Sequence, residues 1–116
     1  DPDHLWSEAD KNDLPGTAYS KSKTAAEART WELAALHADK YSVTTVHPAV
    51  VLGTLLPGQA VSSTMDLMRK ILTGSRPCMM FGVCDSVDVA KVHIAGLERA
   101  ETAGQRYLVC SKNQLS

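Results

Sequence analysis

The chain has 116 residues, of which 44% are apolar and 22% charged, and its net charge is −1. This composition is typical of a globular protein, not of a disordered one, and we expect a single domain over residues 1–116. The near-neutral charge argues against nucleic acid or a membrane surface as a partner, and no apolar run approaches the ~20 residues that a bilayer span needs.

The cysteines and histidines indicate neither a disulfide framework nor a metal site. Cys78, Cys84 and Cys110 are odd in number and lack C-x-x-C spacing, which fits a reducing compartment. The four histidines have no metal-ligand spacing. The first ten residues, DPDHLWSEAD, are acidic and unlike a secretory signal. We therefore expect a cytoplasmic protein without a metal.

The first half of the chain predicts a helix and then a strand. A turn at 13–16 and the cap residue Thr17 precede a run of helix formers over 18–39, with Trp31 as an anchor into a sheet. The β-branched stretch YSVTTVHP, residues 41–48, predicts a buried strand that ends before Pro48. Residues 49–61 are expected to form an apolar loop.

The second half predicts two more helices and two more strands. A helix over 63–73 would begin with a capping box of Ser63 and Asp66 and end at Gly74. A short strand at 78–83, a helix over 86–100 and a strand at 106–110 follow. On the helix over 63–73 the predicted inward-facing residues are Met65, Met68, Ile71 and Leu72. On the helix over 86–100 they are Val89, Ala90, His93, Ile94 and Leu97.

Alternating helices and strands of this kind indicate an α/β layer with parallel strands. Two or three strands are too few for a complete doubly wound sheet, and no G-x-G-x-x-G or P-loop follows a strand. The sequence therefore resembles the second half of a larger fold.

Tyr19 and Lys23 are the candidate catalytic pair. They stand four residues apart, so a helix places them on one face. A free phenol, with a pKa of about 10, is a poor acid at neutral pH, and a neighbouring ammonium stabilises its phenolate. Such a pair could protonate a carbonyl oxygen during its reduction. Three tyrosines and seven lysines give roughly a one-in-six chance of this spacing, so a solvated helix surface remains the alternative for the pair taken alone.

Four longer stretches strengthen the catalytic interpretation. YSKSKTAAEARTWELA, VTTVHPAVVLGTLLPG, DSVDVAKVHIAGLE and GQRYLVC together resemble the C-terminal half of an extended short-chain dehydrogenase/reductase, of the branch with dihydroflavonol and cinnamoyl-CoA reductases. The matching positions are Tyr19, Ser22, Lys23, Ala26, Glu27, Pro48, Val51, Gly53, Asp88, Val89, Ala90, His93, Ile94, Gly104, Arg106 and Tyr107. Thr54 replaces a family proline, Val92 an alanine, and Gln105 is inserted.

The resemblance implies a partial Rossmann-like fold with NADP or NAD as cofactor and a small carbonyl compound or alcohol as substrate. Tyr19 would be the catalytic acid/base, and Lys23 would bind the nicotinamide ribose and tune the tyrosine. Backbone groups from Pro48 to Val51 would face the nicotinamide, and Ser62 or Ser63 would approach the cofactor phosphates. An epimerase or dehydratase of nucleotide sugars, or a hydroxysteroid dehydrogenase, shares the pair and remains an alternative.

Two departures from the family limit this expectation. The family's catalytic serine or threonine and its glycine-rich dinucleotide loop lie upstream of the tyrosine, and no residue here matches them. We therefore expect the 116-residue chain alone to be inactive, and a non-catalytic binding fragment is the second alternative. An isolated half-fold exposes a sheet edge, so self-association or pairing with the missing N-terminal half is expected.

Overall fold

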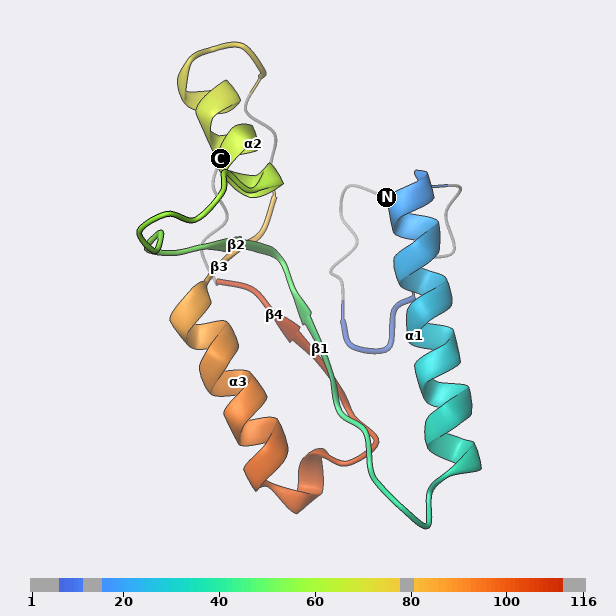
Figure 1. Ribbon diagram of the computed structural model, residues 1–116. Helices are drawn as coiled ribbons and strands as arrows, with labels where there is room; N and C mark the ends of the chain where they lie inside the picture. The colour runs from blue at the N-terminus through green and yellow to red at the C-terminus, as the bar shows by residue number, and fades with distance from the viewer. Residues whose placement is uncertain (1–6, 12–15, 78–80, 112–116) are drawn as a thin grey trace.

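The computed structural model describes residues 7–11, 16–77 and 81–111, and its elements alternate as an α/β fold requires (Figure 1). In chain order they are α1 (Ala18–Leu36), β1 (Thr45–Pro48), β2 (Val50–Leu52), α2 (Ser63–Leu72), β3 (Val83–Asp85), α3 (Ser86–Glu98), the 3-10 turn η1 (Ala100–Thr102) and β4 (Arg106–Val109).

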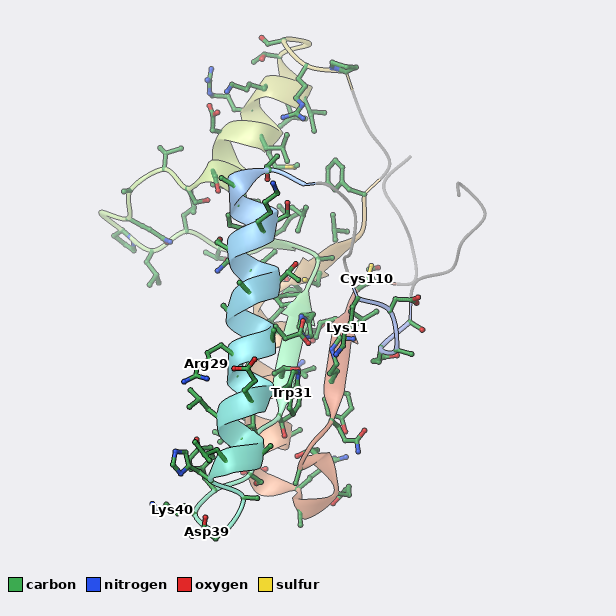
Figure 2. All side chains as sticks on the ribbon, turned by 90° about the vertical axis from the view of Figure 1, so that its right-hand side faces the viewer. Lys11, Arg29, Trp31, Asp39, Lys40 and Cys110 are labelled. Carbon is green, nitrogen blue, oxygen red and sulfur yellow. The ribbon has the colours of Figure 1, made fainter. Side chains whose placement is uncertain are left out.

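The strands form a parallel central layer, with α1 on one face and α3 on the other (Figures 1 and 2). β1 pairs with β4 and β2 pairs with β3, with Val46 opposite Tyr107 and Val51 opposite Cys84. The partner changes at Ala49: its N–H donates to Val109, whereas the next N–H donates to Gly82. The expected α/β fold with parallel strands is therefore confirmed.

The expected loop at 49–61 is wrong at its start, because residues 50–52 form β2. A short apolar run can be a strand or a loop, and only its partner β3, thirty residues later, decides between them. The strand expected at 78–83 is shifted, since β3 begins at Val83 and residues 78–80 lie outside the described part.

The helix caps agree with the sequence at two of three predicted positions. Thr17 caps α1, and Gly74, with φ of 69°, follows the end of α2. The capping box of Ser63 and Asp66 is wrong: Ser62 is the cap, and its hydroxyl accepts from the N–H of Met65. Asp66 instead pairs with Arg69 and Lys70.

The predicted helix faces are partly wrong as well. Leu72 on α2 and Leu97 on α3 are 86% and 89% exposed. On α3 the predicted Val89 is half-buried, together with Val92 and Gly96, whereas the other predicted residues are exposed: Ala90, His93, Ile94 and Leu97. A Cβ at Gly96 would be 3.6 Å from the methyl of Thr44.

The described residues contain a very small core. Cys84 and Thr102 alone are less than a tenth exposed in that part of the chain. The accessible surface is 9106 Å², whereas a compact 12.5 kDa monomer has about 6,200 Å². The radius of gyration is 16.3 Å, against about 13 Å for a compact domain of this length. The layers are therefore arranged as in a larger fold but are incompletely covered. None of the described helices is long and apolar enough to cross a membrane.

Candidate active site

Tyr19 and Lys23 lie on one face of α1, one turn apart, as the sequence predicts. Thr17 starts the helix just before them, because its hydroxyl accepts from the N–H of Ser20 at 3.3 Å. The Lys23 Nζ is 5.5 Å from the centroid of the Tyr19 ring, and Tyr19 is 72% exposed. The phenol and the ammonium are thus close to each other and accessible to a ligand.

The pair borders an open groove of about 480 Å³ between α1 and the strands. α1 contributes residues at every fourth position, and β1 and β4 contribute His47 and Arg106 from the other wall. The lining residues are Asp10, Lys11, Tyr19, Ser20, Lys23, Thr24, Glu27, Ala28, Trp31, His47 and Arg106. The helix face that carries the pair therefore faces the strands.

The three other predicted site residues lie at the end of β1, within β2 and at the start of α2. Pro48 follows His47 directly and is exposed. Val51 is half-buried in β2 and lines a second groove, together with Ser62 and Ser86. Ser63 is in the first turn of α2, whereas its neighbour Ser62 both caps the helix and lines that groove. Pro48 lines neither groove, although its neighbour His47 lines that of Tyr19, and Val51 and Ser62 line the second groove.

Sequence reasoning missed a polar cluster at the far end of the same groove. The Glu27 carboxylate accepts from Arg106, with Nε–Oε1 at 2.6 Å and Nη2–Oε2 at 3.3 Å. The indole N–H of Trp31 donates to Oε1 at 3.2 Å, and the Nε2 of His47 is 3.5 Å from the same oxygen. Trp31 contacts a carboxylate here, so its expected role as an anchor into the sheet includes a polar contact.

The cluster changes the acidity of Glu27. Burial alone raises the pKa of the Glu27 carboxyl, but hydrogen bonds from Arg106 and Trp31 and the charges of His47 and Arg106 outweigh it. The net result is a pKa below the ordinary value of 4.5. Glu27 is therefore a carboxylate at neutral pH, and it is held as one by its neighbours.

One signal in the sequence could have identified Glu27. It follows Lys23 by four residues, so it continues the stripe that begins at Tyr19. Its partner Arg106 is 79 residues away, and no local pattern connects the two.

The remaining candidates have structural roles. Asp85 caps α3 by accepting from the N–H of Val87 at 2.7 Å, and Asp88 pairs with Lys91. Cys84 is a buried free thiol, whereas Cys78, Met79 and Met80 lie outside the described residues. Within residues 7–11, 16–77 and 81–111, no group of three or more metal-ligating side chains comes together.

Known proteins are similar to this chain over most of its length. It is 31% identical over 105 residues to the NADPH-dependent methylglyoxal reductase GRE2 of Saccharomyces cerevisiae, which is 82% of this chain and 31% of the relative. It is 35% identical over 101 residues to the fatty acid hydroxylase uhd1 of Mycosarcoma maydis, covering 83% and 32% of the two chains. No protein-family model matches the chain.

Solved structures have the same arrangement. The crystal structure of yeast methylglyoxal/isovaleraldehyde reductase Gre2 complexed with NADPH has a TM-score of 0.70 at 28% identity, over 83% of this chain and 34% of that one. A reductase engineered to attenuate substrate inhibition in asymmetric catalysis has a TM-score of 0.72 at 24% identity, over 85% and 32%. The chain thus spans about a third of the length of its curated relatives.

Proposed function

We propose that the chain belongs to the short-chain dehydrogenase/reductase family and that it supplies the acid–base pair of a longer, NADP(H)-dependent reductase of small carbonyl compounds. The observation that carries this proposal is the placement of Tyr19 and Lys23. Both side chains line one groove, and the lysine Nζ is 5.5 Å from the tyrosine ring. The reverse reaction, oxidation of a secondary alcohol, uses the same groups.

The chemistry divides between cofactor and protein. NADPH supplies the hydride, and the protein must deliver a proton to the carbonyl oxygen. The Tyr19 hydroxyl is the donor in this proposal, because it is an exposed phenol at the groove. Lys23 stabilises the phenolate that remains, since a nearby ammonium favours the charged form of an acid.

The cofactor contacts are a second part of the proposal. Lys23, Pro48 and Val51 are assigned to the nicotinamide end and Ser63 to the phosphates. Lys23 suits this assignment because it lines the groove of Tyr19. Pro48 suits it because it directly follows His47, which lines the same groove, at the end of β1. Ser62 suits the phosphate role better than Ser63, because Ser62 lines the second groove.

The large accessible surface supports the proposal that another protein segment covers part of this chain. The chain exposes about 3,000 Å² more than a compact monomer of its mass would, and apolar side chains such as Leu36, Leu72 and Leu97 are more than two-thirds exposed. We assign the cover to the remaining part of a reductase about three times as long, which would also hold the dinucleotide. The similarity to the NADPH-dependent methylglyoxal reductase of Saccharomyces cerevisiae favours a reductase over an epimerase or dehydratase.

The test begins with the intact mass of the natural protein and its titration with NADPH, followed by nucleotide fluorescence. A mass well above the 12.5 kDa of this chain, with saturable binding, supports the proposal. Turnover should then be lost in Tyr19→Phe while binding stays. A mass of 12.5 kDa without binding would leave the non-catalytic alternative and reject the enzyme.

A further inference from the structure

Apolar burial holds the helix α1 only weakly to the strands. None of its 19 residues is fully buried: Trp31, Leu33 and Ala34 are half-buried, and Tyr19 and Leu36 near its two ends are 72% and 70% exposed. A surface helix is ordinarily fixed to its sheet by a stripe of buried apolar side chains. A polar contact can therefore contribute to which face of α1 is turned toward the strands.

Glu27 on α1 forms an ion pair with Arg106 on β4. The side chains of Glu27 and Arg106 are 19% and 15% exposed, whereas those of Arg29 and Glu32, which also form an ion pair on α1, are both 65% exposed. The Arg106 guanidinium donates two hydrogen bonds to the Glu27 carboxylate, which fixes the orientation of the two side chains as well as the distance between them. Arg29 projects from the opposite side of α1 to Trp31 (Figure 2).

Arg106 also fixes a third segment. Its Nη1 donates to the backbone oxygens of Glu8 and, at 2.9 Å, of Asp10. The Glu8 carboxylate in turn accepts from the N–H of Leu108 at 3.3 Å. One guanidinium therefore joins the turn at residues 7–10, the helix α1 and the edge strand β4.

We propose that Glu27 and Arg106 are positioning residues that set the rotation of α1 and so hold the Tyr19–Lys23 face toward the end of β1. The inference rests on the proposed function for its purpose, but not for its geometry. Glu27 lies on the same stripe as the pair, two turns from Tyr19 and one from Lys23, so a rotation that displaces one displaces the others.

Small rotations of α1 are enough to matter. A helix with its side chains has a radius of about 5–6 Å, so a rotation of about 20° moves a side-chain tip by about 2 Å. A misplacement of ~1 Å can lower the rate of a reaction about a hundredfold. The ion pair of Glu27 and Arg106 would therefore affect the reaction rate without contacting the substrate.

The test measures the orientation of α1 in the natural protein by residual dipolar couplings of its backbone amides. In the native chain one alignment should describe both α1 and α3. In Glu27→Gln we expect the couplings of α1 to fall by at least half while those of α3 stay. The matched control is Glu32→Gln, which removes a carboxylate of the exposed pair on the same helix, and it should change neither helix.

A second readout reports the contacts of the Glu27 carboxylate directly. The Nε1–H resonance of Trp31 should move in Glu27→Gln, because that N–H donates to Glu27, and should stay in Glu32→Gln. Arg106→Lys keeps the positive charge but cannot donate from two nitrogens at once, and it should reduce the couplings of α1 less than Arg106→Leu does. Unchanged α1 couplings in Glu27→Gln would overturn the proposal. An equal loss of couplings from both helices would overturn it too, because it would mean that the ion pair stabilises the whole fold and does not orient α1. Neither readout depends on turnover, so the proposed function can fail while this inference stands.

Discussion

The hydroxyl of Thr44 donates to the carbonyl oxygen of Thr102 at 2.7 Å, across 58 residues of sequence. Thr102 is one of the two described residues that are buried, at 7% exposed. Its own hydroxyl lies within 2.8 Å of the carbonyl oxygens of both Gly96 and Arg99. This contact holds the segment before β1 against the end of α3, next to the close approach of Gly96 to Thr44.

Thr102→Val should therefore destabilise the chain by about 1–3 kcal/mol, because the carbonyl oxygens of Gly96 and Arg99 lose the donor hydroxyl of the buried Thr102. The measurement is urea unfolding of the 116-residue chain, followed by circular dichroism. Thr73→Val is the matched control: its hydroxyl makes the same kind of bond, to the carbonyl of Arg69 at 2.8 Å, but is exposed. Equal losses in both variants would contradict the role given to Thr102.

Tyr19→Phe should abolish turnover in a chimera in which this chain replaces the structurally equivalent segment of yeast methylglyoxal reductase. We expect a fall in kcat of about 10²–10⁴-fold with methylglyoxal, since that is the usual contribution of a general acid. Binding of NADPH should change little. The control is Tyr41→Phe, which removes a phenol from the other end of α1, where it donates to Leu33. If Tyr19→Phe and Tyr41→Phe retain equal activity, Tyr19 is not the acid.

Gly53→Ala should destabilise the chain, whereas Gly96→Ala should not. A Cβ at Gly53 would lie 2.1 Å from the hydroxyl oxygen and 2.8 Å from the Cβ of Ser86, at the start of α3. Overpacking of this kind costs about 1–3 kcal/mol. At Gly96 the nearest atom would be 3.6 Å away, an ordinary contact, and alanine favours a helix. Thermal unfolding of the two variants, side by side, tests the difference.

How far the sequence alone predicts this structure depends on whether the determining contact is local. The Thr17 cap, the Gly74 stop and the pairing of Tyr19 with Lys23 follow from residues within one or two turns, and all three were predicted correctly. The choice between Ser62 and Ser63 as a cap could not be made, because adjacent serines offer the same hydroxyl and the backbone decides.

The rest depends on residues distant in sequence. The strand β2 forms because β3 pairs with it. Glu27 binds Arg106, which lies on β4, 79 residues later in the chain. Among the predicted inward residues of α3, Val89 is half-buried, whereas Ile94 and Leu97 are exposed for a related reason. Ile94 and Leu97 have the right spacing, yet the sheet meets the helix along Val92 and Gly96.

The two described cysteines should react at very different rates. Burial raises the pKa of the Cys84 thiol, and only the thiolate is nucleophilic, whereas Cys110 is exposed. In a Cys78→Ser background at about pH 8, a maleimide should modify Cys110 first. Peptide mapping after partial labelling checks the order. Modification of Cys84 at the same rate would show that the layer around β3 opens readily.

The stability of the chain should fall in acid as Glu27 takes up a proton. Burial raises the pKa of Glu27, but Arg106, Trp31 and His47 lower it by more, so the folded chain has the lower pKa. A carboxyl of this kind contributes stability that is complete above its unfolded pKa, ordinarily about 4.5, and is lost as the pH falls through the folded value. We therefore expect the free energy of unfolding to decrease from about pH 5 downward.

The variant Glu27→Gln separates this effect from those of other acids. It should be less stable than the native chain at pH 7 and should have a flatter profile below pH 5, because no carboxylate remains there to protonate. Asp66 has a lowered pKa as well, through its bonds to Lys70 and Arg69, but it lies at the surface, so about 0.5 M salt should screen its contribution. A pH profile of Glu27→Gln as steep as the native one, at that salt concentration, would mean that the carboxylate of Glu27 does not hold α1 to β4.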